Sequence, residues 1–255
     1  MAVVYIAVFR DGLRAPAAWM RRWGAAALGL LGVTVLSTTF VQKLVLSAYA
    51  DSTTAVTLPV MGVLAWKILE TLAGGKADNK AKARSLAWQF AWIAVALLNL
   101  KQANLALLGL VLAGMFLVAK EDSKIRLAGV LRLLPVMVLP GLAVYSVWRY
   151  HVAVHLPGGE FLFTPVREWL IPEAFEILKV MLEVAGRKGA YFAMMTAVTV
   201  AAFLALWKYR HPFARLGVTA AASIVGFNPV LWVLYITVFR RLHALHAVSF
   251  WRFNT

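Results

Sequence analysis

Asp51 is the carboxylate of this chain with the best placement for chemistry. It stands in a short polar stretch, Tyr49 to Thr53, between two long apolar stretches. A carboxylate in such a turn can act as a general base, or it can hold a divalent metal ion that neutralises a phosphate leaving group. The structural alternative is that Asp51 or Ser52 caps the helix that follows, and the residue types alone favour this cap.

A second polar group interrupts an apolar run at Lys101, Gln102 and Asn104, shortly after Asn99. The ammonium group supplies charge and the amides supply donors and acceptors, which together suit a phosphate or a hydroxylated ligand. The same residues suit equally a polar turn that sets the depth of a helical hairpin, with the lysine reaching to a membrane interface. The sequence leaves both interpretations open.

Other ionisable residues give weaker signals. Lys43, Lys67, Glu70 and Arg132 lie near the ends of apolar stretches, which favours anchoring at an interface, and a Glu70–Arg132 ion pair is a further hypothesis. His151 and His155 are spaced to share a helix face, but no carboxylate stands at zinc-protease spacing. We therefore predict no histidine metal site, while the involvement of a divalent metal at Asp51 stays open.

The composition indicates which elements position these residues. The chain has 255 residues, of which 62% are hydrophobic and 15% charged, with a mean hydropathy of +0.76. Soluble domains are about 45–50% apolar and about 25% charged. The composition therefore excludes both a soluble globular domain, which could not hide this much apolar surface, and a disordered chain. The sequence contains no cysteine, which excludes disulfides, thiolate metal sites and cysteine nucleophiles.

The apolar stretches predict an all-α fold, a polytopic transmembrane helix bundle that forms a single domain over residues 1–255. About seven stretches approach the length of a membrane span: 24–46, 54–72, 86–100, 103–119, 127–148, 190–207 and 216–238. The segment 148–189 is too polar to span. Within it, residues 171–186 predict an amphipathic helix that starts at Pro172 and lies on the membrane surface or on the bundle; its apolar face comprises Phe175, Leu178, Met181 and Leu182.

The positive charge is distributed unevenly among the loops. The chain carries 26 Lys and Arg against 11 Asp and Glu, a net charge of +15, and basic segments alternate with segments poor in Lys and Arg. The basic segments are 10–22, 73–85, 120–126 and 208–215. By the positive-inside rule they are cytoplasmic, and the turns at 49–53 and 101–102, the segment 148–189 and the C-terminus are extracytoplasmic. This topology and membrane lipids account for the charge, so we predict no nucleic-acid partner.

Three short motifs on the predicted outer side resemble one family. They are Tyr49-Ala50-Asp51, Leu100-Lys101-Gln102-Ala103-Asn104, and the tail from Ala247 to Phe253 with Ser249, Phe250 and Arg252. In this order they are similar to the integral-membrane glycosyltransferases of the GT-C class, over residues from about 40 to 254. Several bacterial branches show a Tyr-x-Asp turn, a Lys-Gln hairpin and a Ser-Phe-x-Arg-Tyr-like tail.

The resemblance implies an enzyme of the bacterial inner membrane. It would transfer a sugar from a polyprenyl-phosphate carrier to a lipid-linked or cell-surface glycan on the extracytoplasmic side. Asp51 would be the catalytic carboxylate. Residues that bind substrate or the lipid phosphate would be Tyr49, Lys101, Gln102, Asn104 and Arg252, and the helix 171–186 would border the substrate cleft.

The chain departs from the family pattern at two places. The principal acidic motif of the class follows the first helix, and no such loop is present here; Phe253 stands where tyrosine is usual. The apolar segment Ala2–Phe9 is too short to span. We expect either an N-terminally truncated fragment, whose acidic loop lies upstream of Met1, or a short interfacial segment. The alternative functions are a membrane transporter or flippase and a non-enzymatic membrane protein.

Overall fold

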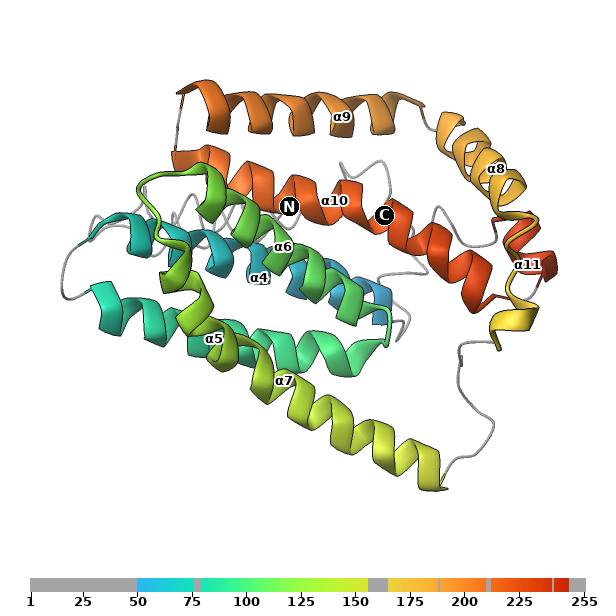
Figure 1. Cartoon of the computed structure of the whole chain (residues 1–255), viewed down its shortest axis with the longest axis horizontal. Coiled ribbons are helices and arrows are strands. Elements are labelled where there is room, and N and C mark those ends of the chain that lie inside the picture. The colour runs from blue at the N-terminus through green and yellow to red at the C-terminus, as the bar shows by residue number, and fades with distance from the viewer. Residues whose placement is uncertain are drawn as a thin grey trace, which may run out of the picture.

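The protein is built from helices. The computed structural model describes residues 50–75, 79–155, 165–187, 189–209, 212–239 and 241–247, and no strand occurs among them. The α-helices, shown in Figure 1, are α4 (Ala50–Ala73), α5 (Asn79–Leu100), α6 (Asn104–Glu121), α7 (Leu127–His155), α8 (Ala174–Gly186), α9 (Gly189–Leu204), α10 (Pro212–Thr237) and α11 (Arg241–Leu245). A 3-10 turn, Val166–Glu168, precedes α8, and a π-turn, Ala205–Tyr209, continues α9.

Five of these helices are long and apolar enough to cross a membrane, namely α4, α5, α6, α7 and α10. Helix α9 and the π-turn that follows it contain a shorter apolar stretch, Phe192–Lys208. The all-α prediction is therefore confirmed, and the composition and length of the helices indicate a membrane protein. The predicted stretches from 54–72 onward all fall on helices, whereas the first, 24–46, lies outside the described residues.

Two predicted boundaries on the segment 148–189 are wrong. Helix α7 continues past residue 148 to His155. The rings of Trp148, His151 and His155 stack on one another along this extra length, which supports the helix beyond the apolar stretch. Helix α8 begins at Ala174, and Pro172 lies in the turn before it instead of at its first position. The amide N–H of Ala174 donates to the carbonyl of Ile171 at 3.2 Å, which closes this turn.

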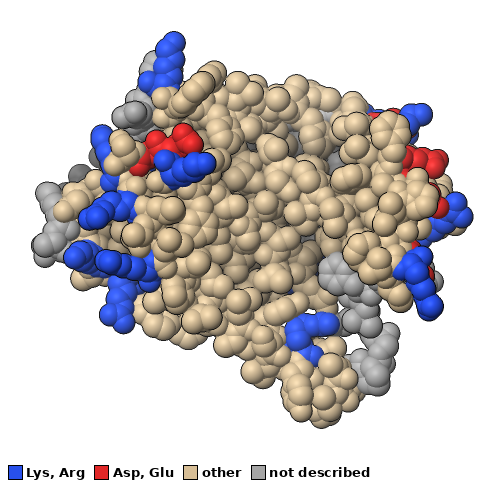
Figure 2. Space-filling view, viewed as in Figure 1, with Lys and Arg blue, Asp and Glu red and all other residues tan. Residues whose placement is uncertain are grey.

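Consecutive long helices run in opposite directions, so the bundle has two ends (Figure 1). One end, called here the basic end, holds the exposed side chains of Lys80, Lys82, Arg84, Lys120, Lys124, Arg126 and Lys208. The other, called the turn end, holds the start of α4, the α5–α6 turn, α8 and α11. Figure 2 shows most of the charged side chains on this face gathered at these two ends, with a broad, largely uncharged surface between them. This banding is expected where hydrocarbon surrounds the middle of a bundle.

The main core lies between α4, α5, α6, α7 and α10. Its largest fully buried side chains include Met61, Ile68, Phe90, Leu97 and Met115. Helices α6 and α10 approach closely at Gly114, where an added Cβ would stand 2.9 Å from the Cα of Thr219. Small residues at such contacts let membrane helices pack backbone to backbone, which compensates for the weak hydrophobic drive between helices in lipid.

A second, smaller core fixes α8 and α11 at the turn end. Ile177 and Met181 of α8 are buried with Leu231 and Tyr235 of α10 and with Ala244 of α11. Polar contacts add to this packing. The indole Nε1 of Trp232 donates to the carbonyl of Ala174 at 2.8 Å, the N–H of Leu170 donates to the carbonyl of Ile236 at 3.1 Å, and Arg241 pairs with Glu173 at 3.0 Å. The α8 segment is thus attached to the end of α10.

Candidate functional site

Asn104 organises the turn end. Its side chain is 2% exposed, and its amide nitrogen donates to the carbonyl of Leu97 at 2.8 Å and to the Oγ1 of Thr54 at 3.1 Å. The first bond joins α6 to the last turn of α5, and the second joins both helices to the first turns of α4. A buried amide needs such partners, because leaving it unpaired would cost about 1–3 kcal/mol. Asn104 therefore fixes the α5–α6 turn against α4.

Lys101 and Gln102 form the turn that Asn104 holds. Both side chains are partly exposed, and the backbone closes around them through the N–H of Asn104 to the carbonyl of Lys101 and the N–H of Leu105 to the carbonyl of Gln102, each at 3.1 Å. The turn is tight, which agrees with the predicted hairpin. Its ammonium and amide groups stand at the end of the bundle where the apolar surface stops, a location that suits either of the predicted roles.

Asp51 belongs to the same end of the bundle. It is the second residue of α4 and precedes Thr54 by about one helical turn. Asp51 and Ser52 already have helical backbone, so neither occupies the capping position that precedes a helix, and the capping interpretation is wrong. The structure therefore brings the Asp51 turn of α4 and the Lys101–Gln102 turn to one end, with the Asn104–Thr54 hydrogen bond between them.

Two predicted site residues cannot be placed. Tyr49 and Arg252 both lie outside the described residues, as does most of the Ala247–Phe253 motif. Their predicted contacts with substrate stay predictions. The ligand role predicted for Asn104 also stays a prediction, although the two internal hydrogen bonds already occupy its amide nitrogen.

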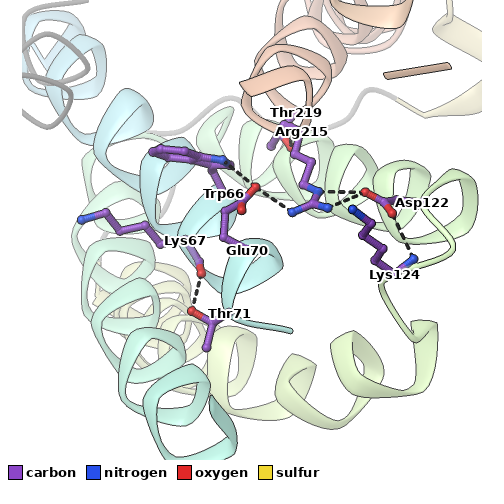
Figure 3. Close-up of polar contacts among 8 residues, drawn as sticks. All are labelled: Trp66, Lys67, Glu70, Thr71, Asp122, Lys124, Arg215 and Thr219. Carbon is purple, nitrogen blue, oxygen red and sulfur yellow. Dashed lines mark hydrogen bonds and ion pairs between the residues drawn. The ribbon is translucent and has the colours of Figure 1, made fainter. Parts of the chain in front are cut away.

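A buried ion network occupies the basic end, as Figure 3 shows. Arg215, in the first turns of α10, is 4% exposed. Its Nη1 lies 2.7 Å from Oε1 of Glu70, near the end of α4. Its Nε and Nη2 lie 2.8 and 2.7 Å from Oδ2 of Asp122, which follows α6 and is 3% exposed. One guanidinium thus ties together the ends of three helices.

The two carboxylates of this network have further partners. Oε1 of Glu70 also accepts a hydrogen bond from the indole Nε1 of Trp66 at 3.2 Å. Oδ1 of Asp122 accepts the backbone N–H of Lys124 at 3.0 Å, which shapes the α6–α7 loop. A buried charge of this kind is stable only when it is paired and hydrogen-bonded, and here each charged group is. The network is a structural clamp, since both carboxylates pair with the one guanidinium of Arg215.

Sequence reasoning missed this clamp. It places Arg215 in a basic loop, gives Asp122 no role and considers Arg132 as the partner of Glu70. In the structure Arg132 is exposed and Glu70 pairs with Arg215, so the proposed Glu70–Arg132 pair is wrong. The scarcity of acids offered the available signal, because only 11 Asp and Glu accompany 26 Lys and Arg. An acid within so basic an end calls for a specific cationic partner.

Within the described ranges, no group of three or more His, Asp or Glu side chains is placed to hold a metal ion. His151 and His155 stack with ring centroids 4.5 Å apart, and Nδ1 of His155 lies 3.1 Å from the carbonyl oxygen of His151. That contact occupies one ring nitrogen of His155 within its own helix. The pair belongs to the exposed last turns of α7.

The fold and its two polar ends define the chain as a helical bundle of the membrane-protein type. Comparisons of the chain with models of protein families, with characterised proteins and with solved structures found no match.

Proposed function

We propose that this protein is an integral-membrane glycosyltransferase that moves a sugar from a polyprenyl-phosphate carrier to a lipid-linked or cell-surface glycan. The observation that carries the proposal is the 3.1 Å hydrogen bond between Asn104 and Thr54. It couples the turn that bears Lys101 and Gln102 to the first turns of α4, to which Asp51 belongs. A carboxylate, an ammonium group and an amide thereby share one end of the bundle.

The location of these groups suits a lipid-linked donor. A polyprenyl chain lies in hydrocarbon, and its phosphate lies at the interface, at the level where the apolar surface of the bundle ends. Lys101 would pair with that phosphate, and Gln102 would donate hydrogen bonds to it or to the sugar. Tyr49 and Arg252 are proposed as further contacts to the donor.

The proposed reaction is a direct displacement at the anomeric carbon. The acceptor hydroxyl oxygen forms a bond to this carbon, and the bond from the carbon to the phosphate oxygen breaks. The electron pair of that bond leaves with the polyprenyl phosphate, whose negative charge Lys101 stabilises. Asp51 takes the proton from the acceptor hydroxyl as a general base, a contribution worth about 10²–10⁴-fold in rate.

The orientation follows from charge. The basic end carries the Lys and Arg of the short loops, so it faces the cytoplasm under the positive-inside rule. The turn end and its proposed site then face the extracytoplasmic side. We propose the bacterial inner membrane as the location, since the resembling motifs are those of bacterial branches.

The test is transfer of labelled sugar by the chain reconstituted in liposomes. Radiolabelled polyprenyl-phosphate hexoses and pentoses serve as donors, and glycolipids extracted from a cell envelope serve as acceptors. We expect Asp51→Asn to lower the turnover by about 100-fold or more and Lys101→Ala to raise the KM for the donor. Lys120→Ala, an exposed substitution at the far end of α6, is the matched control and should leave transfer unchanged.

Three results would contradict the proposal, each in a distinct way. Transfer that survives both Asp51→Asn and Lys101→Ala would show that the site is wrongly assigned. Movement of the labelled lipid across the bilayer without any transfer would favour a flippase or transporter. Neither transfer nor movement, with every donor tested, would favour a non-enzymatic membrane protein.

A further inference from the structure

The amphipathic helix α8 has three distinct faces where the sequence predicts one apolar face. Ile177 and Met181 point into the small core beneath the helix. Phe175 and Leu182, predicted to lie with Met181, are instead 79% and 63% exposed. The single apolar face is therefore split, and half of it has no partner within the described part of the chain.

The three faces follow three lines of residues with the same spacing. The line toward the small core contains Ile177 and the partly buried Val184, and the polar line contains Glu176, Lys179 and Glu183. The apolar line contains the exposed Phe175 and Leu182, with the partly buried Leu178 between them. Neighbouring residues are about 100° apart around a helix. The three lines therefore divide the circumference of α8 into roughly equal thirds, each with its own chemistry.

This division matches the surroundings of a helix that lies at the membrane interface beside its own protein. Such a helix contacts protein with one third of its circumference, lipid with another and water with the last. A helix that is fully in water would expose Phe175 and Leu182 at a cost in free energy, and a helix within hydrocarbon could not accommodate Glu176, Lys179 and Glu183. Large exposed apolar residues in a row mark an interaction surface.

The neighbouring helix α9 indicates that lipid contacts the apolar third of α8. Helix α9 follows α8 after a short connection, and most of its apolar side chains are exposed, including Met194, Val198 and Val200. This surface belongs to the uncharged band that runs between the two ends of the bundle (Figure 2). The exposed line of α8 continues that surface toward the turn end, where Figure 1 shows α8 beside the start of α9.

We propose that α8 lies at the lipid–water interface of the leaflet at the turn end. Its apolar line, Phe175, Leu178 and Leu182, inserts among the acyl chains, while its polar line faces water. The attachment of α8 to α10 through Ile177, Met181 and the Trp232–Ala174 hydrogen bond then sets the depth of the bundle in that leaflet. The partner is a lipid surface, recognised through apolar area and not through a specific headgroup.

The chain offers a direct test because it contains no cysteine, so one introduced thiol carries one nitroxide label. Phe175→Cys and Leu182→Cys place the label on the apolar line. Lys179→Cys and Glu183→Cys are the matched controls on the same helix. Each labelled chain is reconstituted in vesicles of phosphatidylethanolamine and phosphatidylglycerol, and collisions with oxygen and with a water-soluble nickel chelate are measured. Oxygen concentrates in hydrocarbon, whereas the chelate stays in water.

We expect the ratio of oxygen to nickel accessibility to be severalfold higher on the apolar line than on the polar line. Equal ratios on both lines would place the apolar line in water and overturn the proposal. Low accessibility of the apolar line to both reagents would also overturn it, since protein would then cover that line, either another segment of the chain or a second copy. Helical circular dichroism verifies the fold of each variant, and if one of the two apolar variants misfolds, the other carries the comparison with the polar line.

Discussion

Nη1 of Arg215 lies 2.7 Å from Oε1 of Glu70, although 145 residues separate the two along the chain. The same guanidinium reaches Asp122, which belongs to neither of their helices. The order of the helices at the basic end is therefore fixed by charge as well as by apolar packing. Packing between apolar side chains is weakly directional, whereas a planar guanidinium donates hydrogen bonds to carboxylates only in defined positions.

Replacement of Arg215 by methionine should destabilise the bundle strongly. It leaves the buried carboxylate of Asp122 and the half-buried one of Glu70 without their cation, and breaking a buried pair from one side costs about 3–5 kcal/mol. Thermal unfolding in detergent, followed by circular dichroism, measures the loss. Arg126→Met, an exposed substitution at the same end, should leave the melting temperature nearly unchanged. Equal melting temperatures for the two variants would show that the network contributes nothing.

Replacement of Asn104 by alanine should loosen the turn end. It removes the hydrogen bonds that the buried amide donates to Leu97 and Thr54, and the loss of these two bonds costs about 1–3 kcal/mol. Under the proposed function, sugar transfer should fall as well, because the Lys101 turn is no longer held against α4. The matched control is Asn99→Ala, whose exposed side chain donates to the carbonyl of Val95 in its own helix. A loss of stability as large for Asn99→Ala would refute the special role of Asn104.

Two glycines of α6 should respond oppositely to alanine. At Gly114 the new Cβ would meet the Cα of Thr219 at 2.9 Å, so α6 and α10 must separate, at a cost of about 1–3 kcal/mol. At Gly109 no other helix among the described residues lies within 4 Å of the new Cβ, and the higher helix propensity of alanine should stabilise the helix by up to about 1 kcal/mol. The two unfolding midpoints, measured side by side in detergent, test the sign of each effect. A destabilised Gly109→Ala variant would contradict the open space described there.

The sequence predicts the helices well because their signal is local. A run of about 20 apolar residues has few structures available to it, and each such run within the described ranges forms a helix. The ends are less accurate, as at His155, because helical geometry continues into polar residues wherever side chains can reach water. The sequence also predicts that the turns at 49–53 and 101–102 lie on one side, and this too follows from local order, since short connections make consecutive helices run in opposite directions.

The clamp and the split of α8 are beyond such reasoning. Asp122 and Arg215 are 93 residues apart, and no periodic pattern links them. Their pairing depends on which helix ends become neighbours after packing. On α8, Met181 and Leu182 are adjacent in sequence and similar in chemistry, yet one packs in a core and the other is exposed. Hydrophobicity alone does not distinguish a residue that faces protein from one that faces lipid.

The clamp also sets an order of events during synthesis. Chains are made from the N-terminus, so Glu70 and Asp122 leave the ribosome well before Arg215. Until α10 is synthesised, α4 and the end of α6 lack the cation that joins them. We expect both carboxylates to stay hydrated until then. The basic end of the bundle therefore closes late, after α10 has arrived beside α4 and α6, and a chain that stalls before Arg215 leaves this end open.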